Sequence, residues 1–404
     1  MGRDQIVVGL EIGTSKVCAV VGETRGDGTI RILGVGQAPS RGVRKGEIVD
    51  FETAGKCIRE ALVDAEEKSD VMIGSVYLGV TGSHIAGFNN RGAVNIPEER
   101  DEIFDEDFED VQASAREVSI PAANMFVHSI LQHYYVDGQD GVLNPIGMCG
   151  RKLEADFHII HGMATRIKNS VRCVKEVGPE VLDVVFNPLA AAQVVLDQNQ
   201  KGLGALVVDM GGGTMDYIVY VDGAVKQSGA LAIGGDHITN DISLGLRIPM
   251  AKAEKLKFEE GSVILGNSRP GEMIVLKDET GFAGKTIERE MLNTIIHCRV
   301  RESFELLKKR LDEENYLQFL GAGMMLTGGC SLLKGIDHLA EEVFGLPVHV
   351  THAQTVSGLT SAFENPQFST AIGLIKYAEA MQPSQPAGFF QRFVRRLPGF
   401  GLWL

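Results

Sequence analysis

The chain has 404 residues and a formal net charge of −14, from 39 Lys and Arg against 53 Asp and Glu. This length exceeds what one hydrophobic core usually fills, so we expect two or more domains. The negative charge argues against nucleic-acid binding, which needs a basic face, and no apolar run reaches the roughly 18 residues of a membrane-spanning helix.

The first predicted element is a β-hairpin that the second half of the chain repeats. Residues 6–22 and 206–223 each contain a β-branched apolar run, an acidic residue, a Gly/Thr turn and a second β run. The acidic residues and the first glycines of the turns align, Glu11 with Asp209 and Gly13 with Gly211. This repeat predicts a duplicated α/β domain with a ligand between the two copies.

Strands and helices alternate around the two hairpins. In chain order, strands are predicted over residues 30–37, 75–81, 181–187 and 324–327. Helices are predicted over residues 53–68, 189–197, 288–311 and 369–380. Two stretches have the character of insertions: residues 84–163, with strands near 125–136 and 152–161, and residues 236–312.

The first insertion contains an acidic run. Residues 98–110 carry nine acidic side chains and one basic side chain. Phe104, Phe108 and Val111 recur at helical spacing, which favours a helix with a solvated acidic face. A docking surface is the open alternative.

The two Gly/Thr turns are candidate phosphate-binding loops. Glycine lets a turn wrap closely around an oxyanion and offer it several backbone N–H groups. A single such turn is more typical of a plain hairpin, but two aligned copies favour a clamp for a triphosphate formed by Gly13, Thr14, Ser15, Gly211, Gly212, Gly213 and Thr214. Glu11 and Asp209 at the strand ends would hold a hydrated Mg²⁺. Farther on, Gly328 and Gly329 follow a buried strand, where a glycine pair lets a base or ribose approach the backbone, although a turn without a ligand has the same pattern.

Other residues that resemble functional signals are assigned structural roles. Gly284-Lys285-Thr286 matches the end of a P-loop, but Glu279 stands where that motif needs glycine, so we expect a loop before a helix. The histidine pairs lack metal-ligand spacing, so we expect ordinary strand residues at His128, His133, His158 and His161. The six cysteines are widely spaced, and we expect reduced and mostly buried thiols.

The end of the sequence differs in charge from the rest of the chain. Residues 381–388 form a short Pro-containing linker, and from Met381 onward there are three arginines and no acidic side chain. A short amphipathic helix is predicted, with an apolar face formed by Phe389, Phe390, Phe393, Val394 and Leu397 and a basic side formed by Arg392, Arg395 and Arg396. A second apolar patch follows Pro398, formed by Phe400, Leu402, Trp403 and Leu404. We expect this tail to fold on an anionic membrane surface.

Several of these segments together resemble the actin, Hsp70 and sugar-kinase superfold and, within it, the FtsA family of bacterial cell division proteins. The segments are VGLEIGTSKV and VVDMGGGTMD (two phosphate motifs), FNPLAAAQVVLD (a connecting helix) and LTGGCSLLKGI (an adenosine motif). SRGVRKGEIVD (residues 40–50), SVYLGVTGSHI (residues 75–85) and the tail extend the resemblance over essentially the whole chain. It implies duplicated actin-like, ribonuclease H-like α/β domains around an ATP cleft, with an inserted FtsA-type subdomain.

The resemblance also implies an organisation of the chain. The first lobe would comprise residues 1–83 and 164–197, and the second lobe residues 198–235 and 313–380. An SHS2-like subdomain would be inserted at residues 84–163 and a second subdomain at 236–312, with the linker at 381–388 and the tail at 389–404.

The resemblance implies ATP and Mg²⁺ as ligands. It adds Lys16 to the phosphate contacts and Asp216 to the metal region, and it implies that Gly234, Gly235, Glu254, Lys257, Gly328 and Gly329 flank the ribose and base. An exposed charged helix face is the alternative for Glu254 and Lys257. Asn187-Pro188 stands where relatives often place a water-orienting Gln or Glu, so we expect slow hydrolysis.

The implied function is to anchor filaments of the tubulin-like protein FtsZ to the cytoplasmic face of the inner membrane at the division septum. The implied partners are the FtsZ C-terminal peptide, other copies of the chain in filaments, anionic lipid at the tail, and later division proteins at residues 84–163. Lys285, Arg289 and Arg299 are candidate contacts for the acidic-apolar FtsZ peptide. An FtsA-like adaptor of a type IV pilus machine and a small-molecule kinase of the same superfold are the alternatives.

Overall fold

The structure is a computed structural model that describes residues 5–25, 29–266, 268–278, 282–354, 356–359 and 363–381. The predicted linker, apart from Met381, and the predicted tail lie outside the described residues. Within the described ranges, no helix combines the length and the hydropathy needed to cross a membrane.

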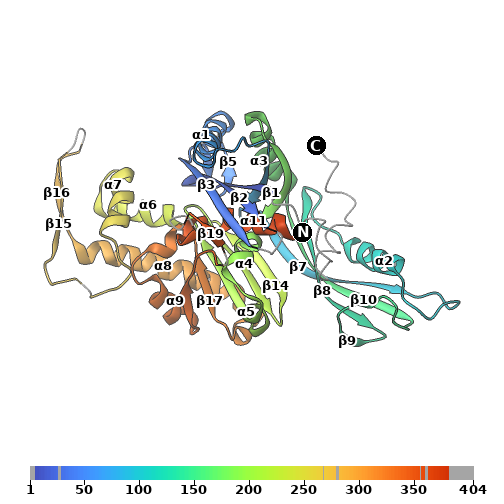
Figure 1. Cartoon of the computed structure of the whole chain (residues 1–404). Helices are drawn as coiled ribbons and strands as arrows, with labels where there is room; N and C mark the ends of the chain where they lie inside the picture. The colour runs from blue at the N-terminus through green and yellow to red at the C-terminus, as the bar shows by residue number, and fades with distance from the viewer. Residues whose placement is uncertain are drawn as a thin grey trace.

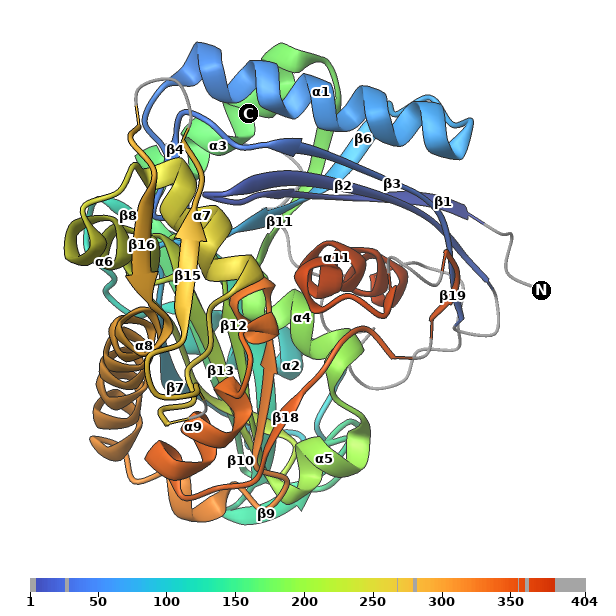
Figure 2. The ribbon, with the colours of Figure 1, turned by 90° about the vertical axis from the view of Figure 1, so that its left-hand side faces the viewer.

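The first lobe is built on a six-stranded sheet. Its strands run in the order β11 (Glu180–Phe186), β6 (Ser75–Val80), β1 (Gln5–Ile12), β2 (Lys16–Thr24), β3 (Ile30–Pro39) and β19 (Val356–Gly358). Helices α1 (Phe51–Ser69) and α3 (Ala164–Val177) cover one face, and α4 (Asn187–Val195) and α11 (Ser369–Ala380) lie against the other (Figure 2). A short hairpin of β4 (Val43–Arg44) and β5 (Glu47–Ile48) precedes α1.

The second sheet has nine strands and extends through two parts of the chain. Five belong to the second lobe, in the order β18 (Val348–Val350), β17 (Met324–Thr327), β12 (Ala205–Met210), β13 (Met215–Val221) and β14 (Ala224–Leu231). The sheet continues through four strands of the first insertion: β7 (Ala86–Asn95), β10 (Lys152–Met163), β8 (Asn124–Val136) and β9 (Gln139–Val142). The two parts join where Gly229 of β14 pairs with Ala86 of β7. The inserted subdomain therefore interrupts the chain of the first lobe, but its strands continue the sheet of the second lobe.

The remaining helices lie on the second lobe and on the inserted subdomain (Figure 1). On the second lobe these are α5 (Gln198–Leu203), α6 (Gly235–Leu246), α7 (Met250–Glu259), α8 (Arg289–Asp312) and α9 (Ile336–Phe344), with a hairpin of β15 (Met273–Leu276) and β16 (Lys285–Glu288). Short 3₁₀ turns are η1 (Leu317–Phe319), η2 (Gly329–Leu332) and η3 (Pro366–Phe368). In Figure 1 the β15–β16 hairpin lies at one end and the inserted subdomain, with α2 (Asp105–Arg116), at the other.

Local sequence determines where helices begin and end. The Asp50 carboxylate caps α1 by accepting the Thr53 N–H at 3.1 Å, and Asp70 ends that helix in the left-handed region. Apolar side chains gather in three clusters. The first is centred on the first lobe and extends onto the second sheet, the second lies in the second lobe and the third in the inserted subdomain; they include Leu10, Phe304 and Phe157 respectively. All three of these side chains are fully buried.

The predicted elements are present, with one correction. Both hairpins form, β17 and α11 have the predicted bounds, and the four histidines lie on β8 and β10. The assignment of Gly284 and Lys285 to a loop before a helix is wrong at Lys285, which begins β16 and pairs with Leu276. Four cysteines are buried, whereas Cys149 and Cys298 are exposed.

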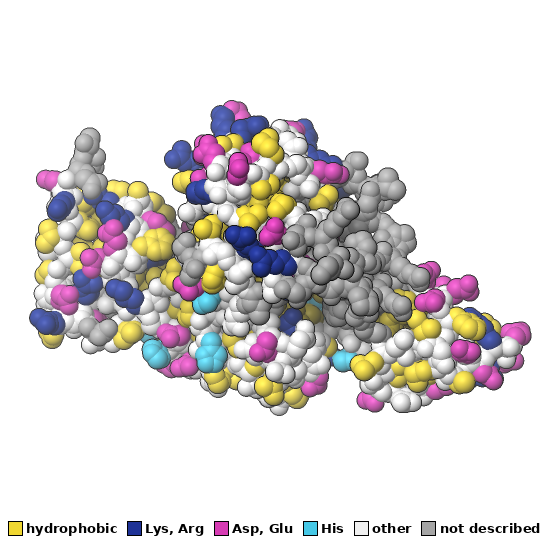
Figure 3. Space-filling model, viewed as in Figure 1, with side chains coloured by type: hydrophobic (Ala, Val, Ile, Leu, Met, Phe, Trp, Pro, Cys, Tyr) yellow, Lys and Arg dark blue, Asp and Glu magenta, His cyan; other side chains and the backbone are white. Residues whose placement is uncertain are grey.

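The acidic run leads into α2, and its second part, from Asp105, forms the start of that helix, as the helical spacing predicts. Val111 is buried, and most of the acidic side chains are exposed. In Figure 3 acidic side chains are spread over the end of the molecule formed by the inserted subdomain. Asp107 is the exception, because it is buried, pairs with Arg100 and accepts the Phe104 N–H at 2.9 Å as part of the helix cap.

Candidate functional site

The two Gly/Thr turns close in the same way. The Gly13 N–H donates to the Lys16 carbonyl between β1 and β2, and the Gly211 N–H donates to the Thr214 carbonyl between β12 and β13, both at 2.9 Å. The repeat predicted from sequence therefore extends to the backbone hydrogen bonds of the turns.

The turns face and contact each other. A Cβ atom on Gly213 would lie 2.3 Å from the Thr14 hydroxyl, and one on Gly212 would lie 3.1 Å from the Ser15 side chain. Glycine is required at position 213 because a side chain there would push the two turns apart.

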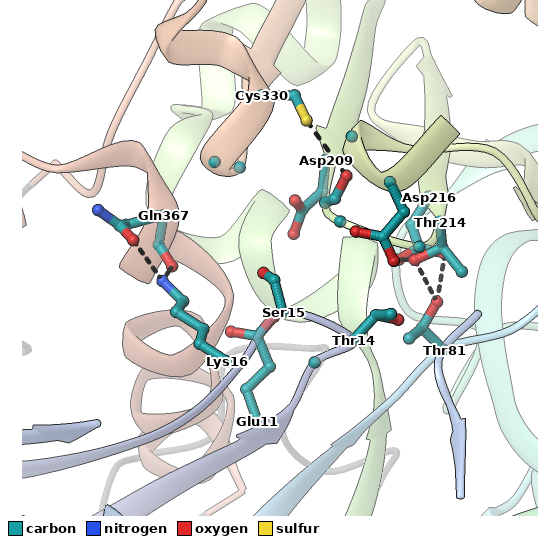
Figure 4. A pocket seen from close by; sticks show the side chains of 18 of the residues that line it. Glu11, Thr14, Ser15, Lys16, Thr81, Asp209, Thr214, Asp216, Cys330 and Gln367 are labelled. Carbon is teal, nitrogen blue, oxygen red and sulfur yellow. Dashed lines mark hydrogen bonds between the residues drawn. The ribbon is translucent and has the colours of Figure 1, made fainter. Parts of the chain in front are cut away.

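A pocket opens between the lobes at these turns (Figure 4). Its lining contains most of the residues predicted from the sequence: Glu11, Gly13, Thr14, Ser15, Lys16, Asp209, Gly211, Gly212, Gly213, Thr214, Asp216, Gly235, Glu254, Lys257, Gly328 and Gly329. Gly234 does not line it, and its Cα packs instead against the carbonyls of Gly211 and Gly212. The lining also contains Thr81, Asn187, Asp236, Phe258, Cys330, Leu332 and Gln367.

Three buried carboxyl groups make the pocket electrostatically unusual. The pKa of Glu11 is raised to about 7, chiefly by burial and also by the neighbouring Asp209, while Lys16 opposes the shift. Burial also raises the pKa of Asp209. It raises the pKa of Asp216 well above its ordinary value. Removing three carboxylates from water disfavours their charged forms, so the pocket favours either protons or a bound cation.

The three carboxyl groups have different partners. Asp209 accepts the Thr370 hydroxyl at 2.5 Å, while Asp216 accepts one hydroxyl at each oxygen, from Thr81 at 2.5 Å and Thr214 at 3.2 Å. One oxygen of Glu11, Oε2, is buried without a partner. Glu11 and Asp209 thus retain capacity for a hydrated cation, whereas Asp216 is already satisfied. Among the described residues no three His, Cys, Asp or Glu side chains are placed to hold a metal directly.

Lys16 lines the pocket, and its ammonium group is bound to another residue of the lining, Gln367. Nζ donates to the backbone carbonyl of Gln367 at 2.5 Å and to its Oε1 at 3.0 Å, and it lies 4.2 Å from the centre of the Phe368 ring. Figure 4 shows the side chain directed toward Gln367. Lys16 therefore joins the first turn to the segment before α11.

Glu254 and Lys257 form part of the wall rather than a solvated helix face. The Lys257 side chain is 4% exposed and donates to Glu254 at 2.7 Å, to the Thr239 hydroxyl at 2.9 Å and to the Gly235 carbonyl at 3.2 Å. The exposed-face alternative is therefore wrong for Lys257. This network connects α6 and α7 at the edge of the pocket.

The glycine pair after β17 brings backbone close to the carboxyl groups. Gly328 has φ = +85°, and a Cβ there would lie 2.2 Å from Asp209 Oδ1, so only glycine fits. Phe258 and Leu332, which are 59% and 49% exposed, supply apolar surface to the pocket lining. Flat apolar surface beside open backbone is suited to a nucleobase.

Asn187 begins α4 inside the pocket. Its side chain is buried, and Oδ1 has no hydrogen-bond partner. A buried amide oxygen without a partner can hold a water molecule, but it is a poor general base.

The pocket also contains residues that the sequence did not single out. Asp236, Phe258 and Cys330 each directly follow a predicted site residue, and Leu332 lies in the LTGGCSLLKGI segment. Gln367 belongs to no segment quoted above and reaches the pocket through tertiary packing. One sequence feature could have indicated Thr81. It is the last residue of the strand predicted over residues 75–81, and that strand pairs with β1, which leads into the first turn.

The predicted FtsZ contacts lie on the subdomain formed by residues 236–312. Arg289 pairs with Glu260 and Glu272, and Arg299 pairs with Asp241. Lys285 donates to the backbone carbonyl of Leu246 at 2.8 Å. An acidic ligand would therefore have to compete with these internal partners. The predicted membrane residues between Phe389 and Trp403 lie outside the described residues.

Comparison with known proteins decides the family. A family model described as "Cell division protein FtsA" matches residues 206–373, and one described as "SHS2 domain inserted in FTSA" matches residues 82–161. The cell division protein FtsA of Pseudomonas aeruginosa is 36% identical over 92% of this chain and 89% of its own length, and that of Escherichia coli K12 is 36% identical over 93% and 90%. The chain belongs to the FtsA family.

Solved structures agree on the fold. A "PilM-PilN type IV pilus biogenesis complex" aligns with a TM-score of 0.65 at 16% identity, over 93% of this chain and 99% of that chain. MreB5 of Spiroplasma citri bound to ADP aligns with a TM-score of 0.55 at 16% identity, over 93% and 96%. At these identities the likeness shows the actin-like fold alone, and with the FtsA relatives it confirms the predicted fold class and family. The FtsA relatives do not favour the pilus-adaptor and kinase alternatives.

Proposed function

We propose that this bacterial cell division protein binds ATP with Mg²⁺ between its two lobes and anchors FtsZ filaments to the membrane. The main support for the nucleotide site is the pair of matched Gly/Thr turns, which face each other beside three buried carboxyl groups. Backbone N–H groups at such turns suit phosphate oxygens, and a cation relieves the buried negative charge.

The residues present fit a magnesium nucleotide. Glu11 and Asp209 would hold the ion largely through water, because each retains acceptor capacity and Mg²⁺ keeps several waters. The ion would neutralise charge on the phosphates. Asn187 provides no carboxylate base, so turnover is expected to be slow.

Titration of the full chain with a fluorescent ATP analogue, with and without Mg²⁺, tests this site. Gly213→Ala should abolish binding because the added Cβ would collide with Thr14, whereas Gly202→Ala has open space and should bind normally. Equal binding by the two variants would refute the proposed site, as would Mg²⁺-independent binding by the unmodified protein.

We assign FtsZ docking to a groove between α6 and α8. Its lining combines apolar and charged groups: Asp241, Leu244, Thr294, Ile295, Cys298, Arg299 and Glu302. Leu244 is 69% exposed, and Arg299 has acidic partners that an acidic-apolar peptide could replace. Arg299 lines this groove, which supports it as the proposed contact, whereas Arg289 and Lys285 do not line the groove and have internal partners.

The two exposed cysteines provide a direct test of docking. Cys298 lies in the groove, and Cys149 lies in the inserted subdomain. A peptide with the FtsZ C-terminal sequence should slow maleimide labelling of Cys298 and leave Cys149 unchanged. Leu244→Ala and Arg299→Glu should each remove the protection, while Arg172→Glu on α3 should not. Protection of both cysteines, or of neither, would argue against the groove.

We propose that residues 389–404 attach the chain to anionic lipid. The support is the sequence pattern of aromatic side chains interleaved with three arginines, which suits an interfacial helix. Trp403 is the single tryptophan, so its fluorescence reports on this segment. Anionic vesicles should shift the emission to shorter wavelength, neutral vesicles should do so less, and deletion from Gly388 should abolish vesicle binding. Emission unchanged by anionic vesicles would refute the anchor.

Self-association and recruitment complete the proposed role. Membership of the FtsA family supports filament formation by copies of this chain. We assign the contact with later division proteins to the inserted subdomain, whose acidic α2 is largely exposed. Removal of negative charge from α2 should weaken recruitment but leave nucleotide binding unchanged, and equal recruitment by such a variant would exclude α2.

A further inference from the structure

The short β4–β5 hairpin is a rigid element that no part of the proposed function uses. Lys45 and Gly46 form its two-residue turn with φ values of +53° and +76°, the left-handed geometry of a tight hairpin. At its base the N–H groups of Val49 and Asp50 both donate to the Gly42 carbonyl, at 2.8 and 3.0 Å.

The tip of this hairpin contacts both phosphate turns. The Gly46 N–H donates to the Thr14 hydroxyl at 3.0 Å, which joins the tip to the first turn. A Cβ on Gly213 of the second turn would lie 3.0 Å from the Lys45 Cα. The hairpin tip therefore lies where the two turns meet.

The tip also brings an unused positive charge to the turns. Lys45 is exposed, and its ammonium group has no hydrogen bond or ion pair to any described residue. Lys16, the lysine of the first turn, is bound to Gln367 instead. Lys45 does not line the pocket itself, but its Cα lies where the two turns meet, so its long side chain can reach a phosphate held between them.

The next residue in the hairpin contacts the base of the inserted subdomain. The Glu47 carboxylate accepts a hydrogen bond from the Arg166 guanidinium in the first turn of α3, directly after β10 leaves that subdomain. On the entering segment, a Cβ on Gly82 would lie 3.5 Å from the Glu47 Cγ.

The entering and leaving segments are themselves joined. His84 Nδ1 accepts the Met163 N–H at 3.2 Å, so one imidazole joins the two crossings, the segments by which the chain enters and leaves the inserted subdomain. The entering segment also contacts the second phosphate hairpin, because the Thr81 hydroxyl donates to Asp216. A displacement of the hairpin tip would therefore be transmitted to both crossings.

We propose that the Lys45-Gly46 turn is a third phosphate-contacting element that distinguishes a triphosphate from a diphosphate. Through the Glu47–Arg166 ion pair it couples this distinction to the position of the inserted subdomain. The proposal rests on the nucleotide site of the proposed function and adds the residue that recognises the terminal phosphate. Lys45 contacts that phosphate, whereas Glu47 is a positioning residue.

The recognition step is tested by measuring ATP and ADP affinities of the full chain. Lys45→Gln should weaken ATP binding by about tenfold, the value of one charge-assisted hydrogen bond, and change ADP binding by less than about twofold. The matched control Lys56→Gln, on α1 and paired with Glu52, should alter neither affinity. Equal loss for ATP and ADP would overturn the proposal, and so would no loss. Failure of the unmodified protein to bind either nucleotide would instead overturn the proposed function.

The coupling step is tested with a donor and an acceptor dye on Cys149 and Cys298. These exposed cysteines lie on the inserted subdomain and on the second lobe. Energy transfer should differ between the ATP and ADP states of the unmodified protein. Glu47→Gln should remove this difference while ATP affinity stays within about twofold, because Glu47 does not line the pocket. Glu52→Gln, an exposed acid on α1, should preserve the difference. A nucleotide-dependent difference that survives Glu47→Gln would overturn the coupling, as would its absence in the unmodified protein.

Discussion

The protonation of Glu11 makes a quantitative prediction for the protein without ligands. Its pKa is raised from 4.5 to about 7, chiefly by burial. Below pH 4.5 the side chain is protonated in both the folded and the unfolded state. Between pH 4.5 and 7 the unfolded state releases this proton and the folded state keeps it, so the free energy of unfolding falls as pH rises. Above pH 7 the full cost of an ionised buried carboxylate is present.

Glu11→Gln removes that cost. A shift of about 2.5 pKa units, from 4.5 to about 7, corresponds to about 3–4 kcal/mol at about 1.4 kcal/mol per unit. Relative to the unmodified protein, the variant should therefore gain stability of this order as pH rises from 4.5 to above 7. The variant also removes the repulsion between the Glu11 and Asp216 carboxylates, which further increases its stability at high pH. The variant should nevertheless lose Mg²⁺-dependent nucleotide binding, since a neutral amide is a weaker partner for a hydrated cation.

Urea unfolding at several pH values, in a chelator and without nucleotide, measures this difference. Other buried groups titrate in the same range, so the informative quantity is the difference between variant and unmodified protein at each pH. Glu52→Gln, which is exposed, should give a difference that does not vary with pH. A pH-independent difference for Glu11→Gln, or one of opposite sign, would refute the assignment of a buried carboxyl with a raised pKa.

Two further variants test the packing around the site. Gly328→Ala should abolish nucleotide binding in a fluorescence titration because its Cβ would collide with Asp209, whereas Gly345→Ala, with a similar positive φ but open space, should bind normally; equal binding would refute the close approach. Ser228→Ala should lower the free energy of unfolding by about 1–3 kcal/mol in urea, since it leaves the buried His158 nitrogen unpaired. Ser129→Ala, whose buried hydroxyl has no partner, should cost less, and the reverse order would contradict the hydrogen-bond assignment.

Local pattern was sufficient to predict the hairpins and their turns. The repeated sequence at Glu11 and Asp209 became two turns with the same closing hydrogen bond, because a Gly/Thr turn between two β runs has few alternatives. The strand at β17 and the helix α11 were predicted to the residue for the same reason, since each combines a strong apolar pattern with clear flanking signals.

Long-range contacts could not be predicted from the sequence. Lys16 lines the pocket as predicted, but no local pattern indicated its partner Gln367, which is 351 positions away. Asp107 belongs to a run of exposed acids, yet it is buried by its pairing with Arg100 and its role in the helix cap. In each case tertiary packing selects the partner of a charged group, and spacing along the chain contains no information about it.

The pairing of β7 with β14 has a consequence for the order in which the chain assembles. The strands of the inserted subdomain are synthesised before β14, so β7 remains an unpaired edge until the second lobe emerges. Unpaired edges invite association with other nascent chains. The centre of β7 is polar, with Asn89, Asn90 and Arg91 in succession, and Asn89 later donates to the Lys226 carbonyl at 2.7 Å. Asn89, which later attaches the subdomain to β14, is thus part of a polar stretch suited to protecting the open edge during synthesis.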